Sequence, residues 1–212
     1  MNKQRILLVT ERFWPEDFII NDVARQLVKD GFIVTVLTQA PSYPKGRLFT
    51  GYRNSLFSTE KWEGIEIIRF FTVEGYKHSL LCKLVNYLSF ALTGSLVVRF
   101  LGKNFNKVFI YQTGPLSLAV PGLIAAKRCK IPVVIWTQDI WPDSVYAYGF
   151  KKTRILHLLL DIFVKWVYAR CDEILISCEG FSERLKKFVP NKSFAFVHNY
   201  PGIDFYDVNY AK

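Results

Sequence analysis

The chain has 212 residues, with 28 Lys and Arg against 18 Asp and Glu, so its formal net charge is +10. Half of its residues are hydrophobic and 22% are charged, a composition that excludes an intrinsically disordered chain. The charge favours an anionic partner: a phosphorylated small molecule, an anionic lipid or a nucleic acid.

Short apolar runs recur along the chain and predict buried strands. They cover residues 6–9, 33–37, 108–111, 133–136, 174–176 and 194–197. Segments with helical period lie between most of them, most clearly at residues 19–30, 154–170 and 179–189. The alternation predicts an α/β fold with a Rossmann-like, doubly wound parallel sheet that is covered on both faces. Residues 56–72, around Glu63-Gly64, predict a hairpin inserted after the second strand.

The predicted helix at residues 154–170 is amphipathic. We expect its apolar side chains to be buried and a stripe of three polar side chains to face outward. The apolar set is Ile155, Leu158, Leu159, Ile162, Phe163, Trp166 and Val167, and the polar stripe is His157, Asp161 and Lys165.

The most apolar segment runs from Leu80 to Leu101. Between Lys83 and Arg99 it is shorter than the ~20 apolar residues that a membrane span needs, and it contains Asn86. We expect a helix buried against the sheet. The alternative is a helix with one face docked into a bilayer interface, flanked by Lys77, His78, Lys83, Arg99 and Lys103.

The four cysteines are Cys82, Cys129, Cys171 and Cys178, and they have no paired spacing. No histidine lies at ligand spacing from them, so we expect reduced core residues in a cytosolic protein rather than a zinc site. The apolar stretch at residues 6–9 is too short for a signal peptide.

The predicted strands end in polar residues. The exits are Thr10-Glu11-Arg12, Thr38-Gln39, Gln112-Thr113-Gly114, Thr137-Gln138-Asp139 and Ser177-Cys178-Glu179. Ligands of parallel α/β sheets bind at the carboxyl ends of the strands, so this edge is the predicted functional edge. Thr and Ser also suit helix N-caps, which is the structural alternative for each residue taken alone.

The first exit loop, residues 11–17, has no glycine that would let the backbone approach a phosphate. A dinucleotide or P-loop site is therefore not expected there. Trp14 offers a flat stacking face and Arg12 a phosphate-binding fork, although Trp14-Pro15 also suits a packed loop plug.

Two further loops carry candidate residues. The loop at residues 40–47 is rigid and basic, and the loop at residues 138–144 places two carboxylates and a tryptophan after a central strand. Asp139 follows that strand directly and is the catalytic candidate, whereas Asp143 also suits a helix cap. The predicted substrate-binding residues are Arg12, Trp14, Tyr43, Lys45, Gln112, Thr113, Gln138, Trp141 and His198, and no metal ligand is predicted.

At these residues the chain resembles a known family. Residues 6–38 resemble the first strand, helix and second strand of a family 4 glycosyltransferase of the GT-B fold. The segments 13–16, 41–46 and 138–144 resemble the subgroup that makes O-antigen and capsular polysaccharide, including fucosamine-type sugar transferases. Residues 198–204 are similar to the linker into that family's second domain.

The resemblance implies a retaining sugar transferase. Residues 1–197 would form its acceptor-side N-terminal domain, and residues 198–212 would begin the interdomain linker, with the donor-binding C-terminal domain absent. The expected donor is a nucleotide sugar, which acts as co-substrate with no further cofactor. The expected acceptor is a polyprenyl-diphosphate-linked saccharide at the cytoplasmic face of the membrane, where the enzyme would be peripheral.

This fragment alone is expected to be inactive. The alternative function is a non-catalytic α/β module that binds a glycolipid or an anionic membrane, which the basic and aromatic composition also suits. Nucleic acid is not expected as a partner, because no helix carries a clustered Arg/Lys stripe.

Overall fold

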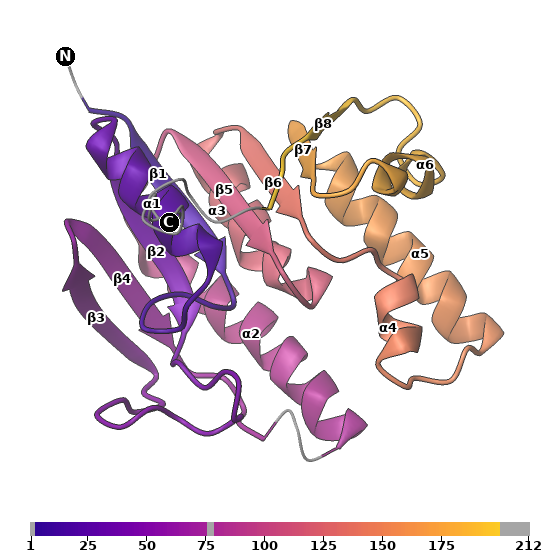
Figure 1. Cartoon of the computed structure of the whole chain (residues 1–212), viewed down its shortest axis with the longest axis horizontal. Helices are drawn as coiled ribbons and strands as arrows, with labels where there is room; N and C mark the ends of the chain where they lie inside the picture. The colour runs from indigo at the N-terminus through magenta and orange to yellow at the C-terminus, as the bar shows by residue number, and fades with distance from the viewer. Residues whose placement is uncertain (1–2, 76–78, 200–212) are drawn as a thin grey trace, which may run out of the picture.

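The computed structural model describes residues 3–75 and 79–199, which form an eight-stranded sheet flanked by helices (Figure 1). The strand order is β3-β4-β2-β1-β5-β6-β7-β8, and every neighbouring pair is parallel except β3 with β4. The strands are β1 (Arg5–Thr10), β2 (Ile33–Gln39), β3 (Phe57–Trp62), β4 (Ile65–Phe70), β5 (Lys107–Gln112), β6 (Val133–Thr137), β7 (Glu173–Ile176) and β8 (Phe194–Phe196). The predicted doubly wound α/β class is confirmed.

The sheet has a topological switch point at β1. This strand pairs with β2 on one side and with β5 on the other, so the strand order reverses there. In doubly wound sheets the crevice at such a point, outside the carboxyl ends of the strands, is where ligands bind.

The predicted hairpin is β3–β4. Its turn residues Glu63 and Gly64 have φ values of 47° and 80°, the positive values that a tight two-residue hairpin turn requires. Because β4 also pairs with β2 in parallel, the hairpin extends the main sheet.

The helices cover the two faces unequally. On one face α1 (Ile19–Lys29) packs Ile20 and Ala24 against Leu8 and neighbouring strand residues. The other face, which includes Leu7 and Val9, packs against four helices. They are α2 (Leu80–Phe100), α3 (Ala119–Cys129), α5 (Arg154–Ala169) and α6 (Gly180–Lys186), and the short α4 (Asp143–Ala147) precedes α5. The alternation of side chains along β1 produces these two cores.

Helix α2 is buried on one face only. Asn86, Phe90, Gly94 and Val98 recur every four residues and are buried, and Gly94 lies close to Phe70 and Pro121. The opposite face exposes Leu81, Leu84, Leu88, Leu92 and Leu96. The helix is long and apolar enough to cross a membrane by length and composition, and 28% of its most apolar window is buried. The expectation of burial is right for the sheet-facing side and wrong for the outward side. Lys77 and His78 lie outside the described residues.

The structure contradicts the predicted burial of the apolar side chains in the first half of α5. Ile155 is 75% exposed, and Leu158, Leu159 and Ile162 are also exposed. The residues buried against the sheet are Val164, Val167 and Tyr168, with Phe163 and Trp166 packed beside them. The helix is apolar on more than one side, and only its second half has a strand beneath it, so periodicity alone selected the wrong face for its beginning.

The cysteines are free, but they do not all lie in the core. Cys171 is buried, and burial raises its pKa to about 12, whereas Cys82 and Cys129 are half-buried and Cys178 is exposed. The expectation of core cysteines is right for Cys171, and Cys129 packs against the edge of the core, whereas it is wrong for the exposed Cys178. Of the predicted linker, only residues 198 and 199 are described, and residues 200–212 lie outside the described ranges.

Candidate functional site

The candidate site begins where β1 and β5 end side by side. Thr10 pairs with Tyr111, so the residues that follow both strands emerge next to each other. The carboxylate of Glu11 lies against the backbone of Gly114, where a Cβ would be only 2.9 Å from Glu11 Oε2. A glycine at position 114 is thus what allows the two exits to touch.

Glu11 is 6% exposed and has two partners at one carboxylate oxygen. Its Oε1 lies 3.0 Å from Arg12 Nη2 and accepts a hydrogen bond from Gln39 Nε2 at 3.4 Å. Burial raises the pKa of Glu11, Arg12 opposes that effect, and the charges of Glu16 and Asp139 raise the pKa further. Glu11 was not among the predicted site residues, although it follows a buried strand as directly as Asp139 does.

Asp139 follows the next strand, β6, and is half-buried. Its Oδ2 accepts a hydrogen bond from the Tyr148 hydroxyl at 2.7 Å. Burial raises the pKa of Asp139, and the bond from Tyr148 lowers it in part. The prediction placed this carboxylate at the strand exit, and the structure adds its phenol partner at the end of α4.

Tyr87, on α2, completes the group. Burial raises its pKa most, the charges of Glu11, Tyr148 and Asp139 raise it further and Arg12 lowers it, so Tyr87 lies within electrostatic range of these groups. We name Glu11, Tyr87, Asp139 and Tyr148 the switch-point cluster. Two carboxyl groups with raised pKa beside two phenols can hold, donate or accept protons, and they can bind hydroxyl groups.

Two glutamines among the predicted residues meet beside this cluster. The side chain of Gln112 is fully buried and donates from Nε2 to Gly114 O at 2.7 Å, while the backbone N–H of Gln138 donates to Gln112 O at 2.9 Å. Within the described residues, Gln112 Oε1 and Gln138 Nε2 are buried with no hydrogen-bond partner. Buried amide atoms of this kind are ones that a ligand or a water satisfies. Thr113, between the two buried exit residues, is half-buried.

The prediction that Arg12 is an available phosphate fork is wrong. Arg12 is 5% exposed, and its Nη1 lies 3.2 Å from Glu16 Oε1 and donates to Ser42 Oγ at 3.1 Å. Glu16 Oε1 also accepts the backbone N–H groups of Ser42 and Tyr43 at 2.8 and 2.6 Å. Because carboxylates on both sides bind Arg12, it ties the first exit loop to the loop at residues 40–47.

The aromatic residues of these two loops remain partly accessible. Trp14 stacks on Trp62 with centroids 4.9 Å apart, so one ring face is covered while the side chain stays 40% exposed. Trp62 ends the edge strand β3, which β4 and β2 separate from β1, so the Trp14 ring is turned toward that edge of the sheet. Tyr43 is exposed beside the Arg12 guanidinium, 5.5 Å from its ring centroid, and Lys45 is exposed on the same loop.

The last two predicted substrate-binding residues lie outside the switch-point cluster. Trp141 is 7% exposed and packs edge-on against Phe163, with centroids 6.4 Å apart. His198 is exposed after the edge strand β8 and packs against Phe196 at 4.5 Å. Neither side chain is brought into the switch-point cluster.

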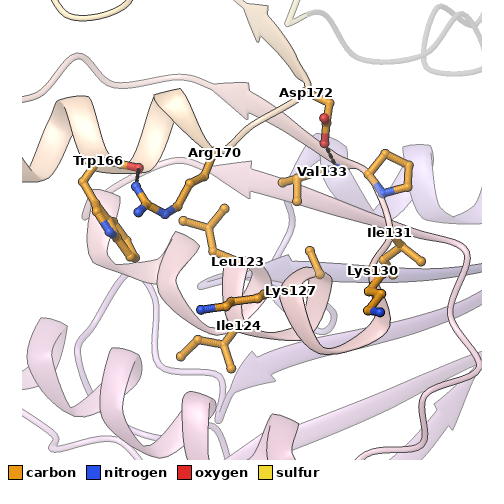
Figure 2. A pocket seen from close by; sticks show the side chains of 11 residues that line it. Leu123, Ile124, Lys127, Lys130, Ile131, Val133, Trp166, Arg170 and Asp172 are labelled. Carbon is orange, nitrogen blue, oxygen red and sulfur yellow. Dashed lines mark hydrogen bonds between the residues drawn. The ribbon is translucent and has the colours of Figure 1, made fainter.

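A hollow of about 890 Å³ lies at the other edge of the sheet, between the ends of α3 and α5 (Figure 2). It contains Lys127 and Lys130 at the end of α3, where cations balance the helix dipole. Arg170 donates to Trp166 O at 2.9 Å and covers the Trp166 ring. These cations serve helix ends, and the hollow is remote from the carboxyl edge.

The fold and site define a doubly wound α/β domain with its candidate site at the switch point. A scan of the chain against protein-family models finds no matching family, and a search of curated proteins finds no match.

Proposed function

We propose that this chain is the acceptor-side half of a glycosyltransferase that moves a sugar from a nucleotide-sugar donor to a lipid-linked saccharide. The observation that carries the proposal is the switch-point cluster, in which Asp139 accepts a hydrogen bond from Tyr148 beside the buried carboxyl group of Glu11. Carboxyl and phenol groups at such an edge suit the hydroxyl groups of a sugar.

The first exit loop supports an acceptor-side role. Glu11 and Glu16 occupy the loop where a dinucleotide-binding domain has glycines around a pyrophosphate, and both carboxylates would repel a phosphate there. The resemblance to family 4 glycosyltransferases supplies the rest of the proposal: a retaining hexosyltransferase of surface polysaccharide synthesis whose donor binds mainly to a second domain. Transfer is accordingly expected of the full-length polypeptide and not of residues 1–212 alone.

The acceptor would be anchored in a membrane, and the chain offers a surface for a peripheral contact. The outward leucines of α2 are exposed, with Lys83 near the start of the helix and Arg99 at its end. Apolar side chains flanked by cations suit the interface of an anionic bilayer. This surface supports a peripheral membrane contact, and the cytoplasmic face is the side that the resemblance implies.

The test is Asp139→Asn in the full-length polypeptide, assayed with nucleotide sugars and a polyprenyl-diphosphate-linked acceptor. The amide keeps an oxygen that accepts the Tyr148 hydroxyl and removes the carboxyl group. We expect kcat to fall about 100-fold or more, the scale of losing an acid/base group. The matched control is Asp30→Asn at the end of α1, where the carboxylate is exposed and accepts a hydrogen bond from Gln26 Nε2 at 2.8 Å. If Asp139→Asn retains full activity with an unchanged melting temperature, Asp139 is a structural residue and the proposal loses its main support.

A further inference from the structure

A second cleft lies beside the switch-point cluster, between α4, α5 and α6. It has a volume of about 510 Å³, and Ile140 and Trp141, which directly follow Asp139, form one wall. The stripe that was expected to face solvent, His157, Asp161 and Lys165, forms the α5 wall of this cleft. Lys165 is exposed as expected, and His157 and Asp161 are half-buried in the cleft wall.

The cleft has an excess of positive charge. Lys152, Lys165, Arg184 and Lys187 line it, against the two carboxylates of Asp143 and Asp161. Asp143 pairs with Arg184 at 3.4 Å, and Asp161 faces His157 at 3.6 Å. In the part of the chain that the structure describes, Lys165 and Lys187 have no ion-pair partner. Two lysines from different helices are thus available to an anion.

The wall also holds an unused hydrogen-bond donor. Trp141 is 7% exposed, and its Nε1 is buried without a hydrogen-bond partner among the described residues. An indole N–H can only donate, so its natural partner is an acceptor such as a phosphate oxygen. A buried donor without an acceptor is costly, which makes this atom unlike the surface lysines around it.

One rim of the cleft is apolar and exposed. Ile162 lines the cleft and is 57% exposed. From Ile162 the apolar strip runs back toward the start of α5. Leu159, Leu158 and Ile155 lie there at helical spacing, and each is more than half exposed. An anion in the cleft would therefore have an uncovered apolar strip leading away from it.

We propose that this cleft binds the diphosphate of an isoprenyl diphosphate and that the exposed strip of α5 binds the first isoprene units of its tail. The proposal rests on the proposed function, because it assigns the lipid-linked acceptor a place next to Asp139. The cations of the cleft recognise the diphosphate, since charged hydrogen bonds to phosphate are the stronger kind. The apolar strip distinguishes a lipid diphosphate from a free one.

The test is calorimetric titration of the chain with three probes: farnesyl diphosphate, inorganic pyrophosphate and farnesol. We expect farnesyl diphosphate to bind at least tenfold more tightly than either part alone. Lys165→Gln with Lys187→Gln should weaken farnesyl diphosphate at least tenfold, and Leu158→Ser with Ile162→Ser should remove its advantage over pyrophosphate. The matched control is Lys127→Gln with Lys130→Gln in the hollow of Figure 2, which should bind as the parent does.

Each outcome decides the proposal, provided that every variant melts within a few degrees of the parent. Equal affinity for farnesyl diphosphate and pyrophosphate would overturn the role of the α5 strip. Equal weakening by the control pair would show that binding follows net charge and not the cleft. Because no sugar is transferred in this titration, its failure leaves the test of Asp139 unaffected, and failure at Asp139 leaves the titration valid.

Discussion

Replacing Glu11 with Gln should change how the stability of this domain depends on pH. Burial raises the pKa of Glu11 in the folded chain, in spite of the Arg12 guanidinium 3.0 Å away. A folded state with a raised carboxyl pKa binds its proton more tightly than the unfolded chain does. The stability from Glu11 is therefore fully present below the unfolded pKa of Glu, near ~4.3, and is lost as pH rises through the folded pKa.

The size of the change in unfolding free energy follows from the linkage between proton binding and folding. Each unit by which the folded pKa exceeds the unfolded one is worth about 1.4 kcal/mol of unfolding free energy at high pH. Gln keeps the shape of the protonated side chain and does not titrate. Arg12 keeps its pairing with Glu16 at 3.2 Å, so the substitution does not leave an isolated buried charge. Glu11→Gln should match the parent near pH 4.5 and exceed its stability at pH 8.

The assay is urea unfolding of parent and variant at pH 4.5 and pH 8 at constant ionic strength. The quantity is the variant-minus-parent difference in unfolding free energy, in which the contributions of other titrating groups largely cancel. Asp139→Asn should show a change of the same sign, because burial raises the pKa of Asp139 as well. A Glu11→Gln variant that loses stability on going to pH 8, relative to the parent, would refute the reasoning. The charge of Arg12 would then lower the pKa of Glu11 by more than burial raises it.

Two further predictions concern the packing of α2 and the contact with a membrane. Gly94→Ala should cost up to about 2 kcal/mol of unfolding free energy, because its Cβ would lie 2.8 Å from Pro121 Cγ and 3.0 Å from Phe70 Cζ. Overpacking costs ~1–3 kcal/mol, from which the helix-propensity gain of ~1 kcal/mol is subtracted. Leu92→Ala on the outward face is the control and should stay within ~0.5 kcal/mol in urea unfolding. The chain should also pellet with phosphatidylglycerol vesicles at low salt and be released at high salt, because Lys45, Arg47 and Lys83 each contribute about 1 kcal/mol near such a surface. Absence of pelleting at low salt would contradict the membrane contact.

The sheet could be predicted because continuous apolar runs have few alternatives. A buried parallel strand such as Val133–Thr137 is covered on both faces, so it is read from a short continuous apolar run bounded by polar residues. The position of Asp139 followed from the end of that strand. Its partner Tyr148 could not be predicted, because the pairing depends on how α4 folds back after the loop.

Ion pairing also explains why Arg12 was wrongly predicted to be available to a phosphate. The sequence shows a guanidinium beside two carboxylates, and it does not show which of them are buried with it. Glu16 could have capped helix α1, yet it accepts the backbone N–H groups of Ser42 and Tyr43 instead. A residue from a loop ~30 positions away therefore determines whether Arg12 is available. Glu11 was missed for a related reason, since its close approach to Gly114 joins two strand exits that are far apart in sequence.

A mismatch in length explains the exposed apolar residues at the beginning of α5 and of α2, whereas the outward face of α2 stays exposed along the whole helix. β7 has 4 residues and spans ~13 Å, whereas α5 has 16 residues and spans ~24 Å. α2, with 21 residues, spans ~32 Å beside strands of 6 residues, which span ~20 Å. Figure 1 shows the first turns of both helices beyond the carboxyl ends of the strands, where no sheet can cover them. Leu81 and Leu84 of α2 and Ile155 of α5 belong to these first turns and are exposed, which suits a ligand with a reactive polar head and an apolar tail.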